Sequence, residues 1–268
     1  NGVKTGEDLT HRVVVDYGKY TPYKDIEIDP ETNPDPVTLT IYDKTTSFDD
    51  IGISNYSMLI PSIDQLNRIM GVLAVITIVN SGDEVWIPDI DNPNLTGLDL
   101  LRFNLPEDFK ELFVESDLPS GNVLQIGTGF ALTNPVPPGE YNILISYLID
   151  YQQESLNFPF RLPYGAGKVT IMLPEGLGNI SGNGLSFFEK ATVNEDKYDS
   201  YGGANYDRGS QLNVKFRNLP GPNIAQQIAG ILTRNGHIIA ISIGTGGILI
   251  GLLIYASILY IRRSNRSL

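Results

Sequence analysis

The order of hydrophobic and polar residues predicts a chain built mainly of β-strands. Apolar and polar side chains alternate over residues 37–42, 141–151 and 211–217, which is the period-two pattern of a half-buried strand. Residues 72–79 form a nearly continuous apolar run that ends at the turn 80–82, and this run predicts a central strand covered on both faces. Residues 168–173 predict a further strand.

Proline- and glycine-rich connections, such as 135–139 and 163–167, separate these strands at short intervals. Frequent turns with few helical periods are typical of an antiparallel β-sandwich, so we expect a mainly β fold of Ig-like or Greek-key type over residues 37–219. Two short helical stretches are expected to interrupt it, at 62–70 and within 106–113.

The N-terminal segment 1–36 is harder to place. Residues 12–17 look like one strand, and a polar, proline-rich connection follows them. One strand cannot bury a core alone, so it either joins the main sheet or remains from a truncated small β-domain. The first residue is Asn1 rather than Met, which indicates that a leader was removed or that the chain is a fragment.

A run of 24 residues without a charge, at 238–261, predicts a transmembrane helix. At about 1.5 Å per residue it spans roughly 36 Å, enough to cross a hydrocarbon core of about 30 Å with some tilt. The tail 262–268 carries Arg262, Arg263 and Arg266, so the positive-inside rule places it in the cytoplasm and the N-terminal domain outside.

The charge distribution separates the ectodomain from the membrane end. All 31 acidic residues but only 12 of the 19 basic residues precede Arg208. Such an acidic ectodomain excludes nucleic acid as a partner and suits a basic soluble protein. The absence of cysteine from so large an extracytoplasmic segment is typical of bacteria or archaea, which points to a bacterial cytoplasmic membrane.

Two features near the membrane predict specific contacts. Residues 223–234 have apolar side chains at Ile224, Ile228, Ile231 and Leu232, which favours an interfacial helix on the bilayer surface over a plain extension of the span. Within the span, small residues at four-residue spacing predict close packing against other transmembrane subunits, the alternative being glycine tolerance in a lone helix. These are Ala240, Ser242, Gly244, Gly246, Gly247 and Gly251.

Candidate catalytic chemistry is sparse. The chain has two histidines, His11 and His237, neither with an evident nucleophile beside it, and no cysteine for a thiolate metal site. Residues 165–168 resemble a phosphate loop only superficially, because a strand and not a helix follows. We therefore expect no enzymatic activity and no cofactor.

Two clusters of oxygen-bearing side chains are candidates for Ca²⁺. Asp89, Asp91, Asn92 and Asn94 form one, although the glycine and glutamate of an EF-hand loop are missing. The second consists of Glu195, Asp196, Asp199 and Asp207. Solvated turn residues are the favoured interpretation of both.

Tyr198, Tyr201 and Tyr206 lie in the glycine-rich segment 197–209. Tyrosine offers a large contact area at low entropic cost, so this segment is predicted either as a docking loop or, equally, as a local cluster packed on the sandwich.

Several turn and core patterns together resemble one family. They are the run 37–51 followed by an apolar strand and the turn 80–82, the Pro137-Pro138-Gly139 connection, and a tyrosine-rich strand before Leu162-Pro163-Tyr164. This combination resembles bacterial membrane-anchored proteins described as carboxypeptidase-regulatory-like, familiar from Chloroflexota. The resemblance implies a small regulatory-like β-domain, a larger β-sandwich and one C-terminal span, without peptidase activity.

These features predict a non-catalytic, single-pass accessory or scaffold subunit of a larger bacterial membrane complex, with an electron-transfer assembly as one host. The alternative is a free-standing surface module that binds a ligand or another cell. The partners expected are membrane lipid, other transmembrane subunits and a basic soluble protein.

Overall fold

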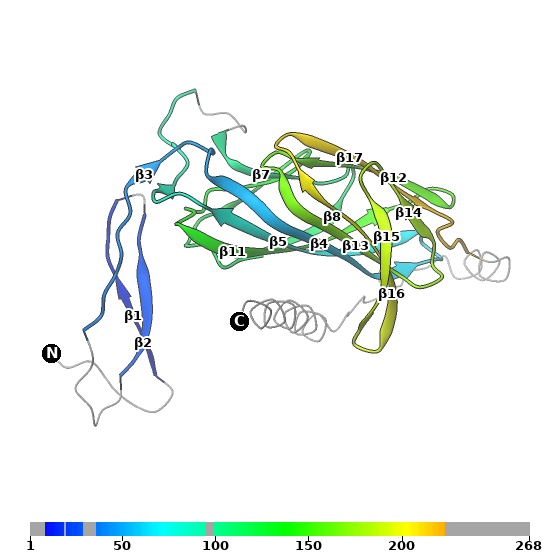
Figure 1. The fold of residues 1–268 in the computed structure, drawn as a ribbon, viewed down its shortest axis with the longest axis horizontal. Coiled ribbons are helices and arrows are strands. Elements are labelled where there is room, and N and C mark those ends of the chain that lie inside the picture. The colour runs from blue at the N-terminus through cyan, green and yellow to red at the C-terminus, as the bar shows by residue number, and fades with distance from the viewer. Residues whose placement is uncertain (1–8, 19, 29–35, 95–98, 223–268) are drawn as a thin grey trace, which may run out of the picture.

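The computed structural model describes residues 9–18, 20–28, 36–94 and 99–222 of the protein (Figure 1). The first strands are β1 Thr10–Val14, β2 Tyr23–Glu27, β3 Lys44–Thr45, β4 Ile51–Asp64, β5 Ile69–Asn80, β6 Val85–Trp86, β7 Leu101–Asn104 and β8 Lys110–Ser116. The others are β9 Val123–Ile126, β10 Gly129–Leu132, β11 Gly139–Asp150, β12 Ser155–Leu162, β13 Ala166–Pro174, β14 Asn179–Ser181, β15 Ser186–Val193, β16 Asp196–Tyr206 and β17 Ser210–Arg217.

No helix among the described residues has the length and hydropathy needed to span a membrane. The predicted interfacial helix 223–234, the span 238–261 with its small-residue face, and the tail 262–268 lie outside the described residues.

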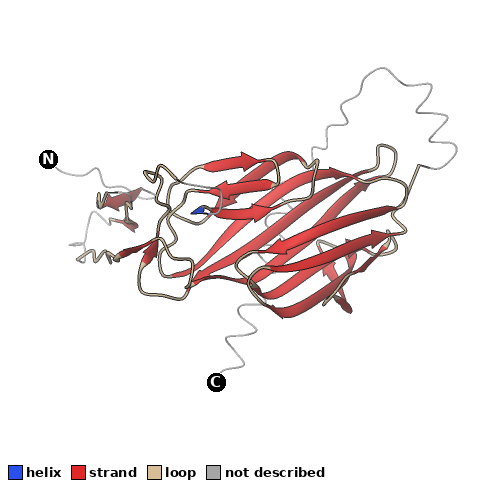
Figure 2. Ribbon diagram, turned by 90° about the horizontal axis from the view of Figure 1, so that it is seen from above, coloured by secondary structure: helices blue, strands red, loops and turns tan. Residues whose placement is uncertain are grey.

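The strands form a sandwich-like, mainly β fold, as the sequence predicts. One layer is a seven-stranded sheet of order β15-β16-β13-β4-β5-β11-β8. The sheets β12-β17-β14 and β7-β10-β9 lie across from it and form the second layer (Figures 1 and 2). The large sheet is mixed and not purely antiparallel, because β13 runs parallel to β4. These two strands are far apart in the sequence, so no tight hairpin fixes their relative direction.

The strands predicted from alternation and from the long apolar run form the centre of the molecule. β5 pairs along its full length with β11, from Gly139↔Asn80 to Asp150↔Ile69. Ile143, Ile145 and Tyr147 of β11 point to the interior and are at most 2% exposed. Because successive side chains of a strand face opposite sides, the period-two pattern in the sequence already identifies this core face.

Three local predictions are wrong. Residues 37–42 form no strand, because this connection lies without a ladder partner and leaves Val37 and Ile41 exposed. Residues 62–70 are the ends of β4 and β5 and the turn between them, where the backbone N–H groups of Leu66 and Asn67 donate to the Asp64 carboxylate. Residues 106–113 hold a turn followed by β8 instead of a helical turn.

The N-terminal segment contains one strand more than the sequence predicts. β1 pairs antiparallel with β2, from Thr10↔Glu27 to Val14↔Tyr23, in a two-stranded sheet of its own. The predicted strand therefore does not join the main sheet. The hairpin extends from one end of the sandwich (Figure 1).

Candidate functional site

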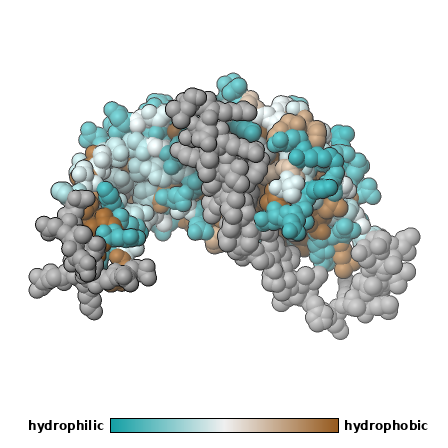
Figure 3. Space-filling view, turned by 60° about the horizontal axis from the view of Figure 1, so that its bottom comes forward, coloured by the Kyte–Doolittle hydropathy of each residue, from teal (hydrophilic) through white to brown (hydrophobic). Residues whose placement is uncertain are grey.

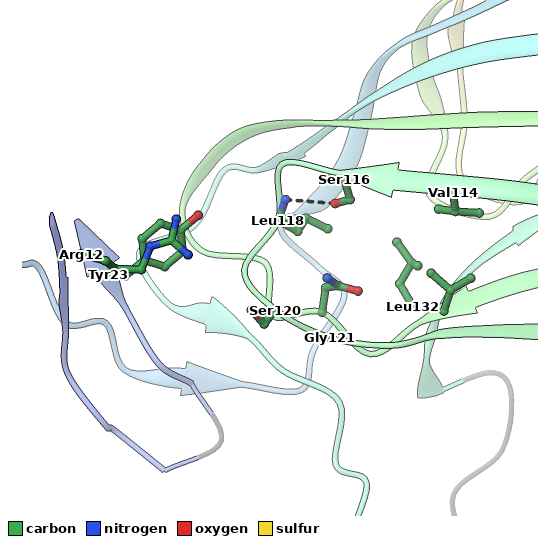
Figure 4. A pocket seen from close by; sticks show the side chains of 10 residues that line it. Arg12, Tyr23, Val114, Ser116, Leu118, Ser120, Gly121 and Leu132 are labelled. Carbon is green, nitrogen blue, oxygen red and sulfur yellow. Dashed lines mark hydrogen bonds between the residues drawn. The ribbon is translucent and has the colours of Figure 1, made fainter. Parts of the chain in front are cut away.

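A cleft of about 350 Å³ lies where the β1–β2 hairpin meets the end of the sandwich. The hairpin contributes Arg12 and Tyr23 to it. The sandwich contributes side chains from β8, β9, β10 and the loops beside them, which are Val114, Ser116, Leu118, Ser120, Gly121, Val123, Leu132 and Asn134 (Figure 4). This volume lies at the lower end of the range for small-molecule sites and suits one or two side chains of a partner.

The hairpin wall is a preformed Arg–Asp–Tyr group. Arg12 Nε and Nη2 donate to the two carboxylate oxygens of Asp25 at 2.7 and 2.8 Å. The Arg12 guanidinium lies 4.0 Å from the centre of the Tyr23 ring. The hydrogen bond from Arg12 lowers the pKa of Asp25, which keeps the carboxylate ionised. Arg12 thus lies over one face of the Tyr23 ring, and Tyr23 remains exposed at the cleft.

Tyrosines attach the hairpin to the sandwich. Tyr20, at the tip of its inner turn, is 5% exposed and packs with Val85 and Ile87 beside β6. The Lys44 ammonium donates to the Tyr17 carbonyl oxygen at 2.7 Å and lies over the Tyr17 ring. Burial, with smaller contributions from Tyr20, Tyr42 and Tyr23, raises the pKa of Tyr141 on β11 to about 12, so its hydroxyl keeps its proton well above neutral pH.

The sandwich wall is shaped by its own backbone. The Leu118 N–H donates to Ser116 Oγ at 3.0 Å, which closes the turn after β8 (Figure 4). Asn134 Nδ2 donates to the Pro119 carbonyl oxygen at 2.7 Å. A Cβ at Gly121 would lie 2.5 Å from the Asn134 backbone, so only glycine permits this close approach. The floor of the cleft is therefore built by glycine packing and amide hydrogen bonds.

The composition of the cleft suits binding and offers no acid–base pair. Its hydroxyls, Ser116 and Ser120, have no imidazole or carboxylate beside them among the cleft-lining residues. His11 faces the opposite side of β1 from Arg12, by strand alternation, and does not line the cleft. The exposed lining of the cleft is more polar than apolar, with hydroxyl, amide and guanidinium groups beside a few apolar and aromatic side chains, and this mixture is suited to hydrogen-bonding side chains of a partner.

The structure places the first calcium candidates in one loop after β6. The Asn92 N–H donates to the Asp89 carbonyl oxygen, and the Asn94 N–H donates to Asn92 Oδ1 at 2.9 Å. Within the described part of the chain, no group of three or more acidic, histidine or cysteine residues could hold a metal. Calcium binding by Asp89, Asp91, Asn92 and Asn94 stays a prediction.

The second acidic group is divided among different surroundings. Asn194 and Glu195 have φ of 48° and 77° and form the two-residue turn between β15 and β16. Asp199 lies within β16 opposite Lys190, and Asp207 accepts the Ser210 N–H at its carbonyl oxygen in the turn before β17.

The predicted tyrosine docking loop is instead strand β16, so the loop assignment is wrong. Tyr198 is 4% exposed, and the Tyr201 ring packs edge-on against Phe187 at 5.7 Å. Tyr206 Oη donates to the Gly184 carbonyl oxygen at 2.7 Å. The three side chains do not form one local cluster either, because Tyr198 packs with Leu59 and Met172 while Tyr201 and Tyr206 pack against the main core.

Sequence reasoning missed the cleft, because one wall comes from residues 12–23 and the other from residues 114–134, far away in the sequence. One signal was present. The segment 17–23 carries three tyrosines at three-residue spacing, of which Tyr23 lines the cleft and Tyr20 packs the hairpin against the sandwich.

The sequence matches no protein-family model and no curated protein. Similar solved structures include a two-domain M1 zinc metallopeptidase bound to L-tryptophan, with 11% identity and a TM-score of 0.38, covering 63% of this chain and 43% of that one. The M1 zinc metallopeptidase from Deinococcus radiodurans has 11% identity and a TM-score of 0.37, covering 63% and 42%. A protein from Legionella pneumophila described as nutrient-binding has 12% identity and a TM-score of 0.34, covering 65% and 70%.

The chain thus spans less than half the length of these metallopeptidases. A likeness this low carries no conclusion about the fold or chemistry of the present protein.

Proposed function

We propose that the protein is a non-catalytic, single-pass accessory subunit whose extracytoplasmic β-sandwich binds another protein of a bacterial membrane complex through the hairpin–sandwich cleft. The observation that carries this proposal is the location of exposed apolar side chains. Of the thirteen exposed large hydrophobic residues in the described part of the chain, eight lie on the hairpin, on the connection after it or on β9. These are Leu9, Val14, Tyr17, Tyr23, Val37, Ile41, Val123 and Leu124.

Concentrated apolar surface of this kind is typical of protein interaction sites, with aromatic residues and arginine enriched at their centres. Tyr23 and Val123 line the two walls of the cleft and are 41% and 46% exposed. The hairpin carries part of this hydrophobic surface, at the left of Figure 3. The acidic charge of the ectodomain favours a partner with a basic rim around its apolar contact.

The membrane anchor of the proposal rests on the 24 uncharged residues 238–261 and the arginines that follow them. We place the protein in the cytoplasmic membrane, with the sandwich outside and the tail inside. Its resemblance to carboxypeptidase-regulatory-like proteins, the Ig-like connectivity of its sandwich and an electron-transfer assembly as host belong to the same proposal.

Co-purification tests this function. The tagged full-length protein would be extracted from its native membranes in a mild detergent, and the proteins that migrate with it identified by mass spectrometry. We expect a defined partner with the unchanged protein and its loss with Val123→Asp or Tyr23→Asp. Leu66→Asp is the matched control, because Leu66 is also exposed but lies in the β4–β5 turn at the other end of the long strands.

Recovery of the same partner with all variants would overturn the cleft as the docking site. Recovery of the chain alone from native membranes would overturn the subunit assignment and favour the free-standing surface module. Membrane attachment is measured separately, by sedimentation of the full-length chain with membranes after alkaline extraction.

A further inference from the structure

The seven-stranded sheet carries a second hydrophobic cluster on the face turned away from the sandwich core. It buries five side chains and partly buries three more. They are Leu59, Leu73, Met172, Val193 and Tyr198, with Val75, Leu144 and Ala191 packed against them. All of them belong to strands of this one sheet, so no other described sheet provides the opposite layer.

The strand registers place the central members of this cluster side by side. Met172 on β13 is paired with Leu59 on β4, and Leu59 is paired with Leu73 on β5. Two residues further along β5, Val75 is paired with Leu144 on β11. At about 4.8 Å between strands, this band crosses four strands over roughly 14 Å. We refer to these five residues as the outer-face band.

If this face met solvent, every second residue of its strands would be polar, as Gln211, Asn213 and Lys215 are on β17. An apolar band in the middle of a sheet therefore requires a covering element with an apolar stripe of its own. At one end, Val193 and Tyr198 of the β15–β16 hairpin pack against the band. The other end, at Val75 and Leu144, is only partly buried.

The chain leaves the described fold beside the β4–β5 turn and the end of β11. Tyr151 Oη donates to the Pro220 carbonyl oxygen at 2.5 Å, and Gly221 lies beside the Arg68 guanidinium in the β4–β5 turn. From that turn to Leu73 is about five residues of strand, or roughly 16 Å. The next twelve residues, 223–234, would span about 18 Å as a helix, so they reach the outer-face band.

We infer that residues 223–234 form an amphipathic helix that packs on the outer-face band of the seven-stranded sheet. Its stripe Ile224, Ile228, Ile231 and Leu232 is the apolar surface that covers the band, while Gln226 and Thr233 face away. A sheet face, and not the bilayer surface, is then where the stripe is buried. The covering segment belongs to the chain itself, because only residues 221 and 222 separate it from Pro220, which is held beside Tyr151.

This docking deepens the proposed function, on whose membrane anchor it rests. Only residues 235–237 would separate the docked helix from the span 238–261. Three residues reach at most about 11 Å, so the sandwich would be held at a fixed orientation close to the bilayer. The hairpin and its cleft would then be presented to neighbouring subunits at a defined height.

Double electron–electron resonance on the full-length chain tests this inference in detergent micelles and in lipid nanodiscs. The chain has no cysteine, so two introduced cysteines carry the only spin labels. One label is placed by Glu115→Cys on β8, which is exposed and paired with Leu144, and the other by Thr233→Cys on the polar side of the predicted helix. We expect one narrow, short distance distribution.

The matched variants decide what causes that distance. Ile228→Asp should abolish the narrow peak, and Gln226→Asp, on the opposite side of the helix, should leave it in place. Val75→Thr is a nearly isosteric change in the sheet that should broaden the distribution without unfolding the sandwich. A broad distribution in the unchanged protein, or a peak that survives Ile228→Asp, would overturn the inference.

Different results distinguish a failure of the helix docking from a failure of the proposed membrane anchor. If a spin label on the stripe, introduced by Ile231→Cys, shows contact with lipid and the distance from residue 115 to residue 233 is broad, the stripe lies on the bilayer, and the docking fails while the anchor stands. If the distance is narrow but the chain does not sediment with membranes, the anchor fails and the docking stands.

Discussion

Asn80 is the side chain whose removal most directly tests how the cleft end of the sandwich is held together. It ends β5, it is 4% exposed, and it makes three hydrogen bonds. Its Nδ2 donates to the carbonyl oxygens of Glu84 and Val136, both at 2.8 Å, and its Oδ1 accepts the Gly82 N–H at 3.0 Å. One side chain therefore joins β5, the turn before β6 and the connection before β11.

The expected loss in the free energy of unfolding follows from these three hydrogen bonds. A typical hydrogen bond contributes about 1 kcal/mol net, and a buried group left without its partner costs about 1–3 kcal/mol. Asn80→Ala should thus lower the free energy of unfolding by about 3 kcal/mol. With a urea slope of about 1–3 kcal/mol per M, the midpoint should fall by at least about 1 M. The fluorescence of Trp86, the single tryptophan and fully buried two residues from Glu84, reports the transition.

Two further variants sharpen this test. Asn157→Ala removes an exposed amide from β12 and should change stability by no more than about 0.5 kcal/mol. Asn80→Asp keeps the acceptor but places a carboxylate against two carbonyl oxygens, which raises the pKa of the new carboxyl in the folded state. Its stability should therefore be higher at acid pH and fall as the pH rises through that value. A loss below about 1 kcal/mol for Asn80→Ala would refute the reasoning.

Two other predictions concern packing and titration. Gly203→Ala should destabilise the protein by about 1–3 kcal/mol in urea unfolding, because its Cβ would lie 1.9 Å from the Gly184 carbonyl oxygen, while Gly52→Ala, with open space around it, should be close to neutral. An unchanged free energy of unfolding for Gly203→Ala would contradict the close approach of the Gly184 carbonyl to Gly203. Burial raises the pKa of Tyr164 to about 12. The folded state then holds this proton more tightly than the unfolded state, so stability should fall between about pH 10 and 12, with a shallower slope in Tyr164→Phe.

Periodicity identified the strands whose partners lie directly beside them. β11 and β17 alternate cleanly because one face meets the core and the other meets solvent or a second layer. The same pattern at 37–42 was misleading, since alternation does not supply a ladder partner. The pattern also could not predict that β13 runs parallel to β4, because side chains alternate with period two beside parallel and antiparallel neighbours alike.

The glycine-rich segment 197–209 shows why composition alone misassigned a strand. Gly202 and Gly203 lie where Phe188 and the Gly184 carbonyl approach β16 too closely for a side chain. They are glycines required by packing, although in the sequence they look like loop residues. The cleft could not be predicted from the sequence either, since Arg12 and Asn134 line one cleft only when the hairpin lies against the end of the sandwich.

Site-specific photocrosslinking in intact cells tests whether the cleft docks a partner subunit. A photoreactive amino acid would replace Val123 in the cleft or, as the control, Leu66 at the far turn. We expect illumination to join the protein to one defined membrane-associated partner from position 123, with no such product from position 66. No product from position 123, or the same products from both positions, would contradict the claim that the cleft docks a partner subunit.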